Sequence, residues 1–193
     1  MNDKQIADII DIYYAQLANK DTRQPKRVVL FSGVPGSGKS TIARAIERNL
    51  RAVRISNDEI RDRIMAAAPT IQPDVREKIK FKVGTGVMTR LARETSGLIV
   101  VDASCDRGFD EYNGWAERNG YRVVLLRMQV SRSVIEERIQ KRDNQGRRNV
   151  SRSLGMLDTW WQQWEKFGKT HTPDLIIRPD TSVEEVFKIV TMA

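Results

Sequence analysis

A glycine-rich segment at residues 33–41 constrains this chain more than any other part of its sequence. The segment is Gly-Val-Pro-Gly-Ser-Gly-Lys-Ser-Thr. It matches G-x-x-x-x-G-K-[ST], in which backbone N–H groups surround phosphates, the lysine contacts the β- and γ-phosphates and the hydroxyl meets Mg²⁺. An apolar run at residues 28–31 precedes it and a helical pattern begins at residues 41–46, as the motif requires. The sequence therefore predicts a nucleoside-triphosphate site between a buried strand and a helix.

The residues of this loop form the predicted nucleotide site. Glycine tolerates positive φ without a steric penalty, and a tight phosphate-binding loop needs such backbone angles. Lys39 is also a predicted catalytic residue, and the hydroxyl of Ser40 is a predicted Mg²⁺ ligand. The predicted nucleotide-binding residues are Gly33, Gly36, Ser37, Gly38, Lys39, Ser40 and Thr41.

The chain carries an excess of positive charge. Its 193 residues have a formal net charge of +8, which favours partners that are rich in phosphate. ATP alone satisfies that tendency, so the charge leaves nucleic acid open as a partner without requiring it. The charge does not indicate an oligomeric state.

The cysteine count and the hydropathy pattern bear on the cellular compartment. The single cysteine, Cys105, excludes an internal disulfide and suits a reducing environment. No apolar run approaches the roughly 18 residues of a membrane span. Asp3, Asp8 and Asp11 interrupt the apolar pattern at the N-terminus, which is unlike a secretory signal. We expect a cytoplasmic protein with no membrane partner.

Apolar runs alternate with helical patterns along the chain. Such alternation is typical of a parallel sheet that is covered by helices and connected by right-handed crossovers. The predicted strands are residues 28–31, 52–55, 98–101, 123–126 and 175–177. The predicted helices include residues 3–18, 41–46, 58–67, 74–95, 109–119 and 182–192. Pro69 and Pro73 separate the third and fourth of these helices.

An acidic residue and an arginine follow the second predicted strand. Asp58 is predicted to accept the proton of an attacking hydroxyl, and Arg61, one helical turn later, to hold a negative group of the acceptor. The alternative is that Asn57 or Asp58 only caps the helix, because both residue types accept backbone N–H bonds. The two roles are compatible if Asn57 is the cap and Asp58 the base.

A second carboxylate, Asp102, closes the third predicted strand. A lone acidic residue after four apolar ones is typical of the strand that binds Mg²⁺ beside a phosphate loop, directly or through water. The alternative is a helix cap or a turn residue. Because the chain already has a phosphate-binding loop, we favour the magnesium role for Asp102.

Basic residues gather after the fourth predicted strand. The segment from Arg127 to Arg152 holds eight basic and three acidic residues. Arg138 and Arg142 are four apart and lie on one helix face, where they are predicted to stabilise a transferring phosphoryl group. A segment that closes over ATP also excludes water, and Gly146 is a candidate hinge. The alternative is a solvated charged helix.

Large aromatic side chains follow this basic segment at helical spacing. Trp160, Trp161 and Trp164 share the pattern with Leu157 and Phe167. The pattern favours a buried helix face over a platform for stacking bases. It leaves open whether one tryptophan lines an acceptor pocket.

Taken in order, these features resemble the small P-loop kinases related to nucleoside monophosphate kinases, and most of all the polynucleotide-kinase-like and zeta-toxin-like group. The loop, the Asp58-Glu59-Ile60-Arg61 element, Asp102 and residues 138–142 carry the resemblance. It implies an α/β, three-layer P-loop NTPase fold with a five-stranded parallel sheet of order 2-3-1-4-5. It also implies ATP and Mg²⁺ as cofactors, with Asp58 as the base and lid arginines on adenine and phosphates.

The length of 193 residues favours one domain, residues 1–193. Residues 1–24 would be an N-terminal helical extension, residues 58–95 the acceptor-binding helices and residues 131–152 the lid. The 5′-hydroxyl kinases of the group often carry two consecutive aspartates before the arginine, whereas Asn57 precedes Asp58 here.

We therefore expect an ATP-dependent kinase that phosphorylates a hydroxyl of a small molecule or of a nucleic-acid 5′ end. Two alternatives remain at this point. One is an ATPase or switch module that acts through protein contacts. The other is a nucleic-acid-binding protein for which ATP is secondary.

Overall fold

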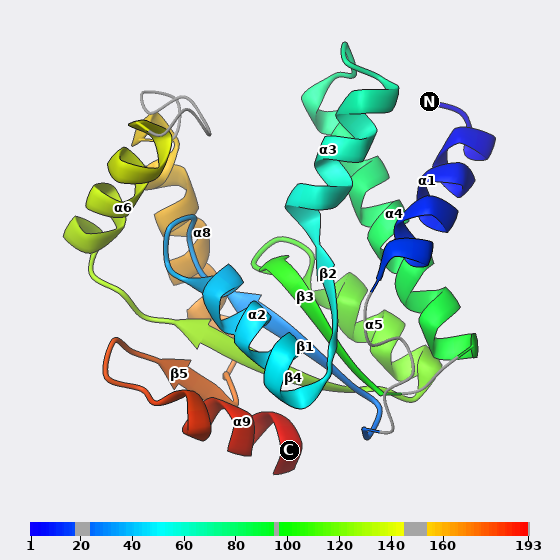
Figure 1. The fold of residues 1–193 in the computed structure, drawn as a ribbon. Helices are drawn as coiled ribbons and strands as arrows, with labels where there is room; N and C mark the ends of the chain where they lie inside the picture. Colours follow the sequence, from blue (N-terminus) through cyan, green and yellow to red (C-terminus); the bar gives the residue numbers. More distant parts are fainter. Residues whose placement is uncertain (18–23, 95–96, 145–153, 193) are drawn as a thin grey trace.

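The computed structural model describes residues 1–17, 24–94, 97–144 and 154–192. Its centre is a parallel sheet of order β2-β3-β1-β4-β5, which confirms the predicted order (Figure 1). The strands are β1 (Arg27–Ser32), β2 (Val53–Ser56), β3 (Leu98–Ser104), β4 (Arg122–Met128) and β5 (Leu175–Ile177).

The strands alternate with helices, as the sequence predicts, so successive strands are joined by crossovers. The helices are α1 (Asp3–Gln16), α2 (Lys39–Leu50), α3 (Asn57–Ala67), α4 (Pro73–Glu94), α5 (Phe109–Asn119), α6 (Arg132–Asn144), α8 (Leu157–Thr170) and α9 (Val183–Met192). Pro73 is the first residue of α4, a position where the missing N–H has no helical partner to lose.

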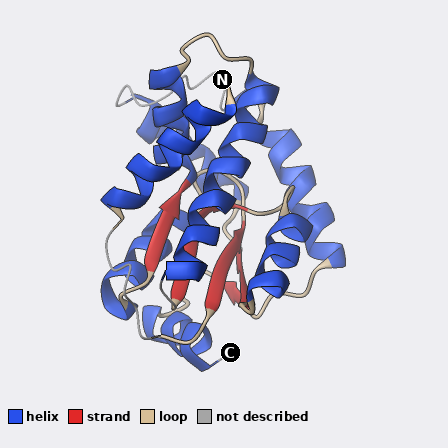
Figure 2. Ribbon diagram, turned by 90° about the vertical axis from the view of Figure 1, so that its right-hand side faces the viewer, coloured by secondary structure: helices blue, strands red, loops and turns tan. Residues whose placement is uncertain are grey.

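Two hydrophobic cores lie on the two faces of the sheet. Successive side chains of a strand point to opposite faces, and β1 shows this clearly: Val28 and Leu30 belong to one core, Val29 and Phe31 to the other. Residues of α1, α3, α4 and α5 complete the first core, and residues of α2 and α9 complete the second. The three layers of the predicted P-loop fold are therefore present, with helices on both sides of the sheet (Figure 2).

Burial on both faces explains why the central strands are apolar throughout rather than alternating. The side chains of Val28, Val29, Leu30 and Phe31 are fully buried. Cys105, directly after β3, is also buried within the first core, as expected for a structural thiol. The described part of the chain contains no helix that is both long and apolar enough to cross a membrane.

The carboxyl ends of the parallel strands lie at one edge of the sheet, where ligands bind in open α/β folds. The helices α6 and α8 rise on one side of this edge, and α1, α3 and α4 rise on the other (Figure 1). The loop at residues 33–38, which follows β1, lies at the same edge. The predicted site residues therefore come from segments that the topology brings together.

Candidate active site

The glycine-rich loop has the backbone shape that an anion site needs. Gly38 has a φ of 102°, a left-handed conformation that favours glycine, and directly precedes α2. A Cβ atom on Gly33 would lie 2.8 Å from the Oγ of Ser37 and 2.9 Å from the Cβ of Met128, so no side chain fits there. Because Gly38 has no side chain to cap α2, the N–H groups of this helix end suit an anion.

Lys39 follows the glycines of the loop, and its side chain is partly buried. Its ammonium donates to the carbonyl oxygens of Gly33 and Val34, both at 2.8 Å. Burial lowers the pKa of Lys39 from 10.5 to about 8, against the opposing charges of Asp106, Asp102 and Asp58. The carboxylates of Asp58 on α3, and of Asp102 and Asp106 near the end of β3, therefore favour the charged form of the ammonium that the motif assigns to phosphates.

Ser40 and Asp102, the predicted magnesium ligands, contact each other. The Oγ of Ser40 donates to Oδ1 of Asp102 at 2.8 Å, and Asp102 is 8% exposed. A hydroxyl and a carboxylate oxygen are ligands that Mg²⁺ prefers, and phosphate oxygens complete its shell in nucleotide enzymes. No cluster of three or more His, Cys, Asp or Glu suited to a metal occurs among the described residues. The pair therefore fits a magnesium ion that is shared with a nucleotide.

Asp58 and Arg61 lie on the first turns of α3 and form an ion pair of 2.8 Å. The Asp58 side chain is 65% exposed, and the same arginine also contacts Asp62 at 2.9 Å. The alternative that Asn57 or Asp58 caps this helix is wrong for both residues. The cap is Ser56, whose Oγ accepts from the N–H of Glu59, because the helix begins at Asn57, one residue earlier than predicted.

The helix α6 lies directly against the loop. Nη1 of Arg138 donates to the carbonyl oxygen of Gly36 at 3.3 Å. Ile135 and Ile139 pack with Val34 of the loop in a small third core. Arg142 belongs to α6, but its side chain and Gly146 lie outside the described part of the chain. Of the two predicted lid arginines, Arg138 thus reaches the loop backbone.

The tryptophans of α8 pack against this third core. All three, Trp160, Trp161 and Trp164, are partly buried against it, which confirms the predicted apolar helix face. The guanidinium of Arg127 lies over the ring of Trp164, 4.3 Å from its centroid. Arg132 of α6 pairs with Asp158 of α8 at 2.7 Å. The loop and the two helices therefore share one hydrophobic cluster.

Comparison with known families agrees with this geometry. The family model of an AAA domain matches residues 28–166, from β1 into α8. The chain belongs to this AAA domain family. The matched residues include the loop, Asp58, Asp102 and Arg138. The helix α1 lies before them. No curated protein sequence is significantly similar to the chain.

Solved structures share the fold at low sequence identity. A chain of the PezAT chromosomal toxin–antitoxin system of Streptococcus pneumoniae is 15% identical with a TM-score of 0.68, over 94% of this chain and 79% of that one. The APS kinase CysC of Mycobacterium tuberculosis, in complex with AMPPNP and APS, is 19% identical with a TM-score of 0.57, over 86% and 98%. A gluconokinase from Sinorhizobium meliloti 1021 is 19% identical with a TM-score of 0.55, over 88% and 92%.

These similarities agree with the predicted resemblance. The AAA domain protein shares its fold with the solved kinase structures.

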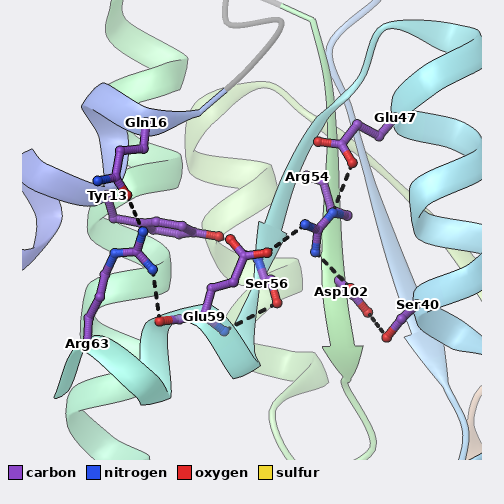
Figure 3. A network of polar contacts seen from close by, with 9 residues as sticks. All are labelled: Tyr13, Gln16, Ser40, Glu47, Arg54, Ser56, Glu59, Arg63 and Asp102. Atoms are coloured by element: carbon purple, nitrogen blue, oxygen red, sulfur yellow. Dashed lines mark hydrogen bonds and ion pairs between the residues drawn. The ribbon is translucent and has the colours of Figure 1, made fainter. Parts of the chain in front are cut away.

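Two charged residues of the site were missed by sequence reasoning. Oδ2 of Asp106 accepts from the N–H of Gly33 at 3.3 Å and from the Oγ of Ser104 at 2.8 Å. Arg54 contacts Asp102 at 3.0 Å (Figure 3). The sequence signals for them were weak. Asp106 is only an acidic residue shortly after Asp102, and Arg54 is only one charge inside a short apolar strand.

Proposed function

We propose that this AAA domain protein is an ATP-dependent kinase that transfers the γ-phosphoryl group to a hydroxyl. The observation that carries the proposal is the contact between the loop and Asp102. The Oγ of Ser40, the residue after Lys39, donates to Oδ1 of Asp102 at 2.8 Å. A candidate metal ligand is therefore joined to the loop that carries the phosphate-binding lysine, which is a combination that phosphoryl transfer needs.

On the nucleotide side, the loop backbone would bind the phosphates. The N–H groups of the predicted residues Gly33, Gly36, Ser37, Gly38 and Thr41 would surround them. Lys39 would leave the two loop carbonyls that it now contacts and neutralise the β- and γ-phosphates. A magnesium ion held by Ser40 and Asp102 would add positive charge at the same oxygens. These roles place the developing charge in a buried, preorganised setting.

On the acceptor side, Asp58 would act as the general base. As the acceptor oxygen attacks the γ-phosphorus, its proton passes to the carboxylate of Asp58, the bond to the bridging oxygen breaks, and ADP leaves. The Asp58 side chain is 65% exposed, so solvent and a substrate can reach it. Arg61, already paired with Asp58, would orient that carboxylate and hold a negative group of the acceptor.

The segment at residues 131–152 would act as the lid of this single domain. Arg138 lies at the loop through its bond to Gly36, and Arg142, one turn later on α6, would join it at the transferring phosphoryl. Closure would exclude water, which competes with the acceptor for the phosphoryl group.

A phosphoryl-transfer screen tests the proposal. Purified protein is incubated with Mg²⁺ and γ-labelled ATP, and with nucleosides, sugars, antibiotics, nucleotide sugars or oligonucleotides that end in a 5′-hydroxyl. Label on an acceptor supports a kinase and identifies the substrate class, with a labelled oligonucleotide indicating a nucleic-acid end. Release of labelled phosphate alone, or a strong preference for GTP, would favour the ATPase or switch module instead.

A further inference from the structure

Arg54 occupies an unusual position between the two halves of the site. It lies on β2, its side chain is 12% exposed, and each of its three guanidinium nitrogens contacts a different carboxylate. Nε bonds to Glu47 of α2 at 3.0 Å, Nη1 to Asp102 of β3 at 3.0 Å, and Nη2 to Glu59 of α3 at 2.6 Å (Figure 3). One side chain thus connects three elements around the site.

Only arginine suits this arrangement. Its donors form a rigid planar fork, whereas the ammonium of lysine is a point charge on a flexible stem. A buried ion pair often adds little net stability over an apolar substitute, because desolvation opposes the attraction. Stability alone therefore explains the three bonds of Arg54 poorly. The geometry of these bonds instead suits a role in orienting the groups that Arg54 contacts.

The first consequence concerns Asp102. Its Oδ2 is held by Arg54 at 3.0 Å and its Oδ1 by the hydroxyl of Ser40 at 2.8 Å. With both oxygens bonded to separate elements, the carboxylate has one orientation. Oδ1 is thereby kept at Ser40, where the proposed function requires a metal ligand.

The second consequence concerns the first turn of α3, which carries Asp58. Glu59 is bonded through its side chain to Arg54, through its N–H to Ser56 and through its carbonyl oxygen to Arg63. The N–H of Ser56 in turn donates to the hydroxyl of Tyr13 at 2.7 Å. Asp58, the residue before Glu59, is thus fixed relative to Asp102 through Arg54.

We propose that Arg54 is a positioning residue that holds the carboxylate of Asp102 and the first turn of α3 in fixed positions relative to each other. Its contact with Asp102 orients the predicted magnesium ligand, and its contact with Glu59 holds the turn that bears Asp58. The proposal rests on the proposed function for the roles of Asp102 and Asp58, but not for the contacts themselves.

The substitution Arg54→Lys keeps the charge and removes the fork, so it tests orientation rather than charge. The matched control is Arg90→Lys, because Arg90 also bridges two carboxylates, Asp11 and Glu94, between α1 and α4. Calorimetry measures ATP affinity with Mg²⁺ and with EDTA. Arg54→Lys is expected to weaken binding about tenfold with Mg²⁺, as changes behind a metal ligand do, and to leave binding in EDTA unchanged. Arg90→Lys is expected to change neither.

Hydrogen exchange of the backbone provides the second measurement. Arg54→Lys is expected to speed exchange at the start of α3 but not in α9. Glu59→Gln, which weakens only the α3 contact, is expected to speed the same amides while Mg²⁺-dependent ATP affinity stays unchanged. This second variant decides the α3 contact even if Arg54→Lys does not fold.

The outcomes separate this inference from the proposed function. If the wild type binds ATP equally with and without Mg²⁺, the magnesium role of Asp102 fails, while hydrogen exchange still tests Arg54. If the wild type depends on Mg²⁺ but Arg54→Lys shows the same dependence and the same exchange at α3, the positioning role is overturned. Equal losses in Mg²⁺ and in EDTA would also overturn it, because they indicate a general structural defect.

Discussion

The candidate site has a nucleotide half, formed by the loop and Asp102, and an acceptor half, formed by Asp58 and Arg61. The two halves differ in how firmly contacts within the protein hold their side chains. Lys39 is partly buried with two loop carbonyls as partners, and Asp102 is bonded at both oxygens. Asp58 is instead 65% exposed on a helix surface, with Arg61 beside it. The nucleotide half is therefore preorganised, whereas the acceptor half presents its groups to solvent and depends on neighbouring elements for its position.

The largest expected effect follows from removing the ammonium of Lys39. Lys39→Met should lower phosphoryl transfer by about a thousandfold, because positioned charge at the phosphates commonly contributes about 4 kcal/mol to the transition state. Transfer is measured with labelled ATP, and Lys188→Met, an exposed lysine of α9, is the control. Near-normal transfer in Lys39→Met would contradict the assignment of the nucleotide half.

The next effect tests the acceptor half. Asp58→Asn should lower the transfer rate by about a hundredfold or more, as expected for loss of a general base, with ATP affinity unchanged. Asp62→Asn is a close control, because Asp62 lies one turn later on α3 and contacts the same arginine. Equal losses in the two variants would show that the pairing with Arg61 matters and that proton transfer to Asp58 does not.

A smaller effect tests whether the acceptor half depends on α1. Tyr13→Phe leaves the N–H of Ser56 without its partner in a buried setting and should lower the free energy of unfolding by about 1–3 kcal/mol. Denaturant titration measures it. Tyr14→Phe is the control, since the Tyr14 hydroxyl bonds to Glu94, which also has Arg90 as a partner, and it should be milder. An equal loss of unfolding free energy in the two variants would show that the bond between Tyr13 and Ser56 has no special role.

The smallest effect is a pH dependence of ATP binding. Because burial lowers the pKa of Lys39 to about 8, the free protein loses this charge as pH rises through 8, and bound phosphates favour the charged form. ATP affinity should therefore fall as pH rises above about 8, with proton uptake on binding. For the same reason, the stability of the free protein should rise between about 8 and 10.5, where only the unfolded state binds the proton. Calorimetry in two buffers measures the uptake, and a Lys39→Met variant that keeps the pH dependence would contradict this cause.

Local patterns determined the fold of the nucleotide half. Residues 28–31 are apolar because both sheet faces are covered, and the glycines before Lys39 mark the turn into α2. These signals are short-range, since strand, loop and helix are adjacent along the chain. The strand order followed from the resemblance rather than from the pattern, because alternation alone allows several orders.

The contacts that join the two halves were decided only by the tertiary structure. Arg54 gave no signal beyond one charge in a strand, and its partners Glu47, Glu59 and Asp102 lie on three other elements. The capping of α3 by Ser56 rather than Asn57 depended on where α3 begins. Sequence spacing reports which residues share an element, whereas a buried ion network depends on how elements pack. The sequence by itself therefore determined a phosphate-binding loop and its fold, and only packing decided how that loop is connected to Asp58.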